Sequence, residues 1–278
     1  MNRSSRARAF DSSVISDPAS TPQAELTPNS LVDIAGIPVA NLSQEEAMAV
    51  IEKLVLSGGS HYMTVVNAAK IVTARDNAKL RDVILNADLV TADGMSVVWA
   101  SRLLGRSLKG RVTGIDMFDK LLERASAMGW SVYLLGASEE SLREVAARLT
   151  TRYKTLRLAG SHNGYFGASE AGDIADEISA ARADLLFVAM GSPSQEYWIS
   201  ENLLRSGVRF AMGVGGAFDH LSGRSRRAPR WMQDAGLEWF YRLMREPRRL
   251  WRRYLIGNSI FIWLVLRQLI SRGSRPRP

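Results

Sequence analysis

Short runs of apolar residues alternate with longer amphipathic segments along most of the chain. The apolar runs WSVYLLG, DLLFVAMG and VRFAMGVGG each end in small residues, and helical periodicity follows the first two. A buried strand, a loop and a helix, repeated in this way, are typical of a parallel sheet. The sequence therefore predicts an α/β fold with a mostly parallel sheet and helices on both faces (Rossmann-like), followed by a basic helical C-terminal appendage.

Capping residues and changes in composition mark the boundaries of the elements. Ser43 precedes the helical pattern SQEEAMAVIEKLVL, and Glu46 completes a capping box. Ser138 or a neighbour caps the helix after WSVYLLG. The pattern predicts a disordered tail at 1–28, an α/β catalytic domain at 29–223, an Arg/Trp-rich appendage at 224–270 and a disordered tail at 271–278.

The stretch ADLVTADG reads as a short buried strand with Asp93 directly after its end and Gly94 opening the next helix. In open α/β sheets, ligands bind at the carboxyl ends of the strands. Asp93 is therefore the leading candidate for chemistry. The alternative is that its carboxylate caps the following helix through a backbone N–H.

Three predicted strands end in glycine-containing loops, around Gly136, Gly191 and Gly215. Glycine lets a backbone approach a ligand closely, and a helix N-terminus attracts phosphate. These loops indicate a nucleotide or sugar-phosphate site, although glycine also makes tight turns between strand and helix. The chain contains neither GxGxxG nor GxxxxGK[ST], which disfavours dehydrogenases and P-loop NTPases.

Charge is distributed unevenly between the body and the C-terminal segment. Residues 222–278 hold fourteen Arg and three acidic residues, a net of +11, so residues 1–221 carry −3 of the total of +8. Such asymmetry points to a polyanionic partner, either an anionic membrane or a nucleic acid. The absence of cysteine excludes disulfides, thiolate metal sites and cysteine nucleophiles, and the three scattered histidines do not suggest a metal site.

The C-terminal segment predicts two helices, at 229–244 and 247–270, each beginning at a proline. The apolar run at 254–266 is shorter than the roughly 20 residues that span a bilayer. An interfacial amphipathic helix is favoured, with a helical hairpin packed on the body as the alternative. The aliphatic run IFIWLVL argues against a nucleic-acid tail. The first residues lack the apolar core of a secretory signal, so we expect a cytoplasmic protein, peripheral on the inner face of the membrane.

Eight blocks with this order and spacing resemble the WecG/TagA/CpsF family of bacterial glycosyltransferases, over residues 31–266. The blocks are VVNAAK, NADLVTADGMSVVWASRLLG, RVTGID, GYF, MGSPSQEYW, GVGGAFDHLSG, RRAPRWM and GLEWFYRLMREPRRLWRRYL. The resemblance implies inverting transfer from a UDP-sugar to a polyprenyl-diphosphate-linked sugar in cell-surface polysaccharide biosynthesis. We expect no cofactor.

The resemblance also assigns roles to matched positions. Asp93 matches the general base. Asn67, Arg111 and Gln195 match the UDP-sugar site, and Arg242, Arg249 and Arg252 match an arginine group for the acceptor's pyrophosphate and the membrane. Many relatives carry T-x-N where this chain has Val65-Val66-Asn67, with Thr64 one residue earlier. This departure leaves the donor open between N-acetylmannosaminyl and glucosyl types.

Inverting transfer needs one base and stabilisation of the UDP leaving group. The chain contains no Asp-x-Asp, so we expect catalysis without a metal, with arginines and helix N-termini serving the diphosphate. Glu196 is a second candidate carboxylate, which could instead bind a ribose hydroxyl or cap a helix. Two alternative functions stay open: a nucleotide-binding module with a nucleic-acid tail, and an inactive scaffold of a polysaccharide-assembly complex. Assembly into a homo-oligomer also stays open.

Overall fold

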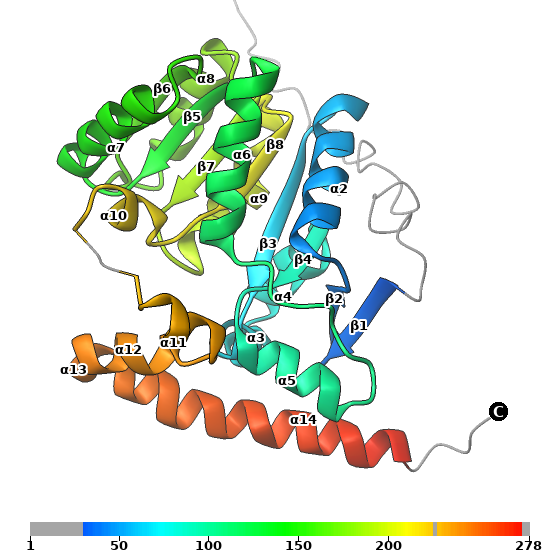
Figure 1. Cartoon of the computed structure of the whole chain (residues 1–278). Coiled ribbons are helices and arrows are strands. Elements are labelled where there is room, and N and C mark those ends of the chain that lie inside the picture. The colour runs from blue at the N-terminus through cyan, green and yellow to red at the C-terminus, as the bar shows by residue number, and fades with distance from the viewer. Residues whose placement is uncertain (1–29, 225–226, 274–278) are drawn as a thin grey trace, which may run out of the picture.

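The computed structural model describes residues 30–224 and 227–273. A six-stranded sheet forms its centre, in the order β4-β3-β8-β7-β5-β6, and every neighbouring pair is parallel (Figure 1). The strands are β3 (His61–Val66), β4 (Leu89–Ala92), β5 (Ser131–Gly136), β6 (Arg157–His162), β7 (Leu185–Ala189) and β8 (Phe210–Gly213). The predicted α/β, mostly parallel fold is confirmed. The tail predicted at 1–28 lies outside the described residues.

The inner strands β5 and β7 are buried throughout and mostly apolar, because helices cover both faces of the sheet. Successive side chains alternate between two cores: Tyr62 and Val66 pack in one, and Met63 and Val65 in the other. The first core lies under α3 (Ala68–Asp76), α4 (Ala78–Leu85), α8 (Ala171–Ala180) and α9 (Ser194–Ser206). The second lies under α2 (Gln44–Ser57), α6 (Gly114–Met128), α7 (Glu139–Arg152) and α10 (Ala217–Leu221).

The predicted helix starts agree with the structure. Ser43 and Glu46 form the expected capping box at the start of α2, and the Ser138 side chain caps α7. A separate antiparallel hairpin, β1 (Leu31–Ile34) and β2 (Ile37–Ala40), precedes α2, and α5 (Met95–Leu103) follows β4.

The C-terminal helices depart from the predicted pair. The first is broken into α11 (Arg230–Asp234) and α12 (Glu238–Arg245) at Gly236, whose φ is +72°. A Cβ there would lie 2.8 Å from the Trp99 ring, so glycine permits the close approach of this turn to α5. The second continues from α13 (Pro247–Trp251) through a π-helical turn (Arg252–Ile256) into α14 (Gly257–Gly273). Residues 271–273, predicted as tail, therefore belong to a helix; residues 274–278 lie outside the description.

Helix α14 runs beneath α3 and α5 along one side of the molecule (Figure 1). Phe261 and Val265, four residues apart, are buried in the first core. Gln268 accepts a hydrogen bond from Ala35 N at 2.7 Å, which ties the far end of α14 to the β1–β2 hairpin. By length and composition alone, the stretch Tyr254–Ser271 could cross a membrane.

Candidate active site

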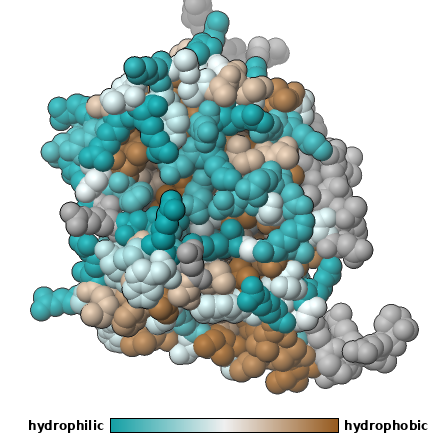
Figure 2. All heavy atoms as spheres, viewed as in Figure 1, coloured by the Kyte–Doolittle hydropathy of each residue, from teal (hydrophilic) through white to brown (hydrophobic). Residues whose placement is uncertain are grey.

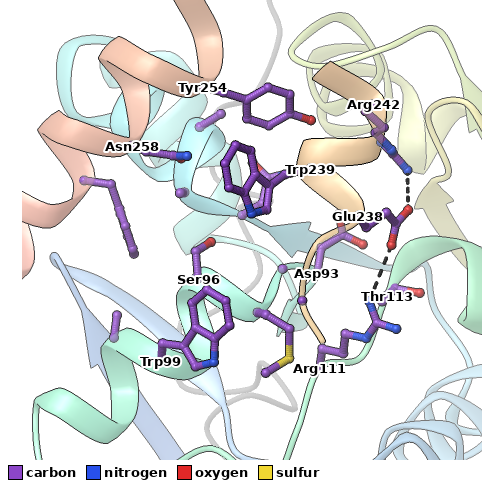
Figure 3. Close-up of a pocket in the computed structure, with 18 of the residues that line it drawn as sticks. Asp93, Ser96, Trp99, Arg111, Thr113, Glu238, Trp239, Arg242, Tyr254 and Asn258 are labelled. Atoms are coloured by element: carbon purple, nitrogen blue, oxygen red, sulfur yellow. Dashed lines mark hydrogen bonds and ion pairs between the residues drawn. The ribbon is translucent and has the colours of Figure 1, made fainter. Parts of the chain in front are cut away.

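A cavity of about 360 Å³ opens at the carboxyl ends of β3 and β4. One wall comes from the body, namely the start of α3, helix α5 and the loop before α6. The other comes from α12, the π-helical turn and α14 (Figure 3). The appendage therefore completes a site that begins on the sheet edge. Asn67, Asp93, Arg111 and Arg242, all predicted site residues, line this one cavity.

Asp93 lies directly after β4, and its backbone N–H extends the sheet by donating to Val66 O at 2.9 Å. Its Oδ1 accepts from Gly114 N, the first residue of α6, at 3.1 Å. The N-terminal end of α6 thus faces this carboxylate. Helix α5 has Gly94 as its N-cap, with no side-chain cap, so the interpretation of Asp93 as the cap of that helix is wrong.

Asn67 directly follows β3 and caps α3, with Oδ1 accepting from Lys70 N at 3.0 Å. Capping uses the amide oxygen and fixes the rotamer, and the residue lines the cavity next to Gly94. The side chain is therefore held rigidly at the sheet edge beside Asp93.

Three arginines line the cavity: Arg111, Arg227 and Arg242. Arg111 Nη1 lies 3.4 Å from Glu238 Oε2, and Arg242 Nη2 lies 2.8 Å from Glu238 Oε1 (Figure 3). Although burial opposes it, the charges of Glu238 and Asp93 hold the pKa of Arg242 above its ordinary value. The site thus carries fixed positive charge on both walls.

Arg227 is a site residue that the sequence reasoning missed. Its Nη1 lies 2.6 Å from Asp116 Oδ1, in the first turn of α6. Burial of Asp116 works in the opposite direction, but the hydrogen bond from Arg227 keeps the pKa of that carboxyl below its usual range. The only sequence signal for Arg227 is the RRAPRWM block, and nothing in that block distinguishes Arg227 from the neighbouring arginines.

The remainder of the cavity wall is apolar. Trp99 and Leu103 of α5 face it from the body, and Phe261, Ile262 and Val265 of α14 face it from the appendage. The Trp239 and Tyr254 rings lie 5.8 Å apart and close the side next to Arg242. The cavity therefore combines a charged part at the sheet edge with an apolar part between α5 and α14.

The model of the glycosyl transferase WecG/TagA/CpsF family matches residues 32–275. The chain belongs to this family. Membership makes it a glycosyltransferase and implies a nucleotide-sugar donor and a lipid-linked acceptor. The carboxylate and the arginines of the cavity are residue types that such a transfer requires.

Gln195 and Glu196, two further predicted site residues of this glycosyltransferase, do not line the cavity. Both are buried in the first turn of α9. Lys70 Nζ lies 2.9 Å from Glu196 Oε1, and Gln195 Nε2 donates to the same oxygen at 2.9 Å. Burial raises the pKa of Glu196, but the charge and hydrogen bond of Lys70, together with hydrogen bonds from Ser192 and Gln195, hold it below its ordinary value. Glu196 is therefore a carboxylate committed to an internal ion pair.

The buried pair fixes the loops around it. Gln195 Oε1 accepts from Gly215 N at 3.0 Å, which joins the start of α9 to the loop after β8. Lys70 belongs to α3, the helix that Asn67 caps. This cluster of Lys70, Gln195 and Glu196 thus links the carboxyl ends of β3, β7 and β8.

The three predicted glycine loops lie on the same sheet edge, after β5, β7 and β8, outside the lining of the cavity. Gly136 has a φ of +122°, and a Cβ there would lie 2.4 Å from Ala189 O, so packing between β5 and β7 requires glycine at this position. Gly191 and Gly215 have open space where a side chain would stand, and their role in donor binding stays a prediction.

Of the last two predicted arginines, only Arg252 has a side chain that the structure describes. Arg252 is exposed, with its guanidinium 5.3 Å from the Trp251 ring centroid, and it does not line the cavity. Arg249 lies in α13, and its side chain falls outside the description. Within residues 30–224 and 227–273, no group of three His, Asp or Glu side chains is arranged to hold a metal ion.

Proposed function

We propose that this glycosyltransferase transfers a sugar from a UDP-sugar to a polyprenyl-diphosphate-linked sugar, with inversion, in cell-surface polysaccharide biosynthesis. The observation that carries the proposal is one cavity that joins Asp93, three arginines and an apolar wall between α5 and α14. An acceptor of this class has a hydroxyl to activate, a diphosphate to bind and a prenyl chain to bury. The cavity offers Asp93 for the hydroxyl, arginines for the diphosphate and the apolar wall for the prenyl chain.

Asp93 is the proposed general base. A single displacement requires a carboxylate that takes the proton of the acceptor hydroxyl as its oxygen attacks the anomeric carbon. The hydrogen bond from Gly114 N occupies Oδ1 and orients the group, and the residue lines the cavity. No covalent enzyme intermediate is needed, so one carboxylate suffices.

The arginines are proposed to stabilise the two diphosphates. Arg111 belongs to the body, near Asp93, and is assigned to the leaving UDP. Arg242 belongs to α12, beside the apolar part, and is assigned to the acceptor diphosphate. Guanidinium groups bind phosphate through paired N–H donors, which a lysine does not reproduce. Because the arginines supply positive charge for the diphosphates, and the chain contains no Asp-x-Asp, we propose metal-independent catalysis.

Helix α14 is proposed to lie in the interface of the membrane at its cytoplasmic face. Its inner side buries Phe261 and Val265 on the body, while Ile262, Trp263 and Ile270 are exposed. Apolar surface gathers along this edge of the molecule (Figure 2). The Arg267 guanidinium lies 5.4 Å from the Trp263 ring centroid, and Trp with Arg is typical of the headgroup region. A helix packed along the body in this way favours lying on the membrane over crossing it.

The decisive experiment measures UDP release from a panel of UDP-sugars, with EDTA present, and a short-chain prenyl-diphosphate-sugar acceptor. We expect release with one donor, only when acceptor is added, and a product whose anomeric configuration is inverted. The same acceptor without its diphosphate is the control and should react poorly. Acceptor-independent release, or a product with retained configuration, would overturn the proposal.

Membrane docking is tested separately by flotation with phosphatidylglycerol vesicles. The double variant Trp263→Glu/Ile270→Glu should lose vesicle binding, because it places charge on the exposed side of α14. Leu204→Glu is the matched control, since Leu204 is 81% exposed on α9 and should tolerate the change. Equal binding by all three proteins would contradict the docking role of α14, and binding to oligonucleotides instead would favour the nucleic-acid alternative.

A further inference from the structure

Glu238 is a carboxylate inside a site built to bind anions. It begins α12, and its side chain is 19% exposed. One of its oxygens faces Arg111 of the body and the other faces Arg242 of the appendage (Figure 3). A phosphate group bound at either arginine would use guanidinium N–H groups that now face Glu238.

We propose that Glu238 acts as an internal anion that occupies Arg111 and Arg242 in the empty site and is displaced when a diphosphate binds. This inference rests on the proposed function, since it takes both arginines to be diphosphate ligands. It assigns to Glu238 a regulatory role: it sets the affinity of the site for diphosphate and takes no part in proton transfer.

The two contacts of Glu238 differ in strength. The contact with Arg242 is 2.8 Å long and joins residues four apart on one helix, a spacing that favours such a pair. The contact with Arg111 is 3.4 Å long and crosses from the appendage to the body. The longer contact is the weaker one, so an entering diphosphate displaces Glu238 from Arg111 first.

The charges that line the cavity support competition. Three arginines face two carboxylates, Asp93 and Glu238. Arg227 is already bound to Asp116, outside the lining, and stays paired in either state. Removal of the Glu238 charge therefore leaves Arg111 and Arg242 with Asp93 as the nearest lining carboxylate and strengthens their attraction for phosphate. A carboxylate at this position lowers affinity for diphosphate, and this aids release of UDP after transfer.

A purely supporting role for Glu238 predicts the opposite sign. If the carboxylate only held the two guanidinium groups in a binding geometry, its loss would let them reorient, and diphosphate would bind more weakly. The direction of the change in Kd therefore separates displacement from support. Uridine lacks phosphate and reports whether the nucleoside part of the site has changed.

The experiment measures Kd by calorimetry for UDP, inorganic pyrophosphate and uridine, at one salt concentration, with the full chain. Glu238→Gln should bind UDP and pyrophosphate about tenfold more tightly, which corresponds to about 1.4 kcal/mol, and uridine unchanged. Glu201→Gln is the matched control, because Glu201 pairs with Lys79 on an exposed surface outside the cavity lining. It should leave all three constants unchanged. Thermal melts of each variant check that it folds, and Glu238→Ala provides a second variant without an amide.

The outcomes distinguish the inference from the proposed function. Equal or weaker UDP binding by both Glu238 variants, with clear binding by wild type, would overturn the displacement role and leave the proposed function standing. An equal gain for uridine would also overturn it, because the effect would then be a general opening of the site. Binding of UDP and pyrophosphate by neither wild type nor variants would overturn the diphosphate site, and the inference with it.

Discussion

The two ends of the parallel sheet use the same residue types for different purposes. At the amino end, Asp88 Oδ2 accepts from Tyr62 N at 2.9 Å, and its Oδ1 lies 3.0 Å from His61 Nδ1. Asp184, farther along the same end, accepts from both the N–H and the hydroxyl of Ser131, each at 2.8 Å. These carboxylates tie neighbouring strands together, and each accepts two hydrogen bonds or close polar contacts from protein.

At the carboxyl end, Asp93 follows the strand that Asp88 precedes. Among the described residues, its carboxylate accepts from Gly114 N alone, and it lines a cavity with cationic walls. Two aspartates flanking the same four-residue strand thus differ in what surrounds them. A carboxylate whose acceptor sites are filled stabilises the fold, whereas one with open sites beside a cavity is available for proton transfer.

The largest expected effect is a loss of activity from a substitution at the carboxyl end of the sheet. Asp93→Asn keeps the size of the side chain but removes its basicity, so kcat should fall by about 100-fold to 10⁴-fold, the usual range for a lost general base. Thermal stability should change little, because Asn can still accept from Gly114 N. Steady-state UDP release together with a thermal melt measures both quantities. A variant that keeps more than about a tenth of wild-type kcat would remove Asp93 from the mechanism.

A substitution at the amino end of the same strand should have the opposite result, with stability lowered and activity kept. Asp88→Asn should lower the free energy of unfolding by about 1–3 kcal/mol, because it weakens a buried acceptor of two hydrogen bonds. The kcat of the folded fraction should stay near wild type, because Asp88 lies at the opposite end of the sheet from the cavity. Urea unfolding and active-site-normalised kcat measure the two quantities. A large loss of kcat without loss of stability would contradict the division between the two ends.

Much of this contrast could be predicted from sequence, because position along a strand is a local property. Asp93 and Asn67 each follow an apolar run, and the carboxyl ends of parallel strands meet at one edge. The capping box at Ser43 and the α/β class follow from local spacing in the same way. These features require only the order of residues within one strand–loop–helix unit.

Contacts between distant segments could not be predicted in this way. Glu196 also follows a strand, but its pairing with Lys70, 126 positions earlier, buries it. Arg227 and Glu238 enter the site because the appendage packs back on α3 and α5, and nothing local distinguishes them from neighbouring charges. The break at Gly236 has the same origin, since it depends on the proximity of Trp99.

A smaller effect is expected on the Kd for UDP, and it distinguishes an arginine at the carboxyl end of the sheet from one at the amino end. Arg111→Lys keeps the charge but loses the paired N–H geometry, and should raise the Kd for UDP about tenfold, or about 1.4 kcal/mol. Arg209→Lys is the matched control, since Arg209 pairs with Asp184 at the amino end at 3.4 Å and is half exposed. It should leave the Kd unchanged. Calorimetric titration of UDP measures both, and equal effects would contradict the assignment of Arg111.

The smallest expected effect is a pH dependence of stability at the amino end. His61 Nδ1 faces Asp88 and its Nε2 lies 3.0 Å from Gly58 O, so the cationic ring can donate from both nitrogens. The hydrogen bond with Asp88 raises the pKa of His61 above its ordinary value. A raised folded-state pKa contributes stability that is complete below the unfolded pKa of about 6.5 and is lost as pH rises through the folded value.

Urea unfolding of wild type and His61→Gln, from about pH 5.5 to 8.5, isolates this contribution, since other titrating groups cancel in the difference. Wild type should be the more stable protein at the acidic end, and its advantage should shrink as pH rises. Asp88→Asn should flatten the wild-type dependence in the same way, because it removes the partner that raises the pKa. A difference that stays constant across the range would mean that the pKa of His61 is the same in the folded and unfolded chains. The amino end would then be held by the Asp88–Tyr62 hydrogen bond, without the ion pair.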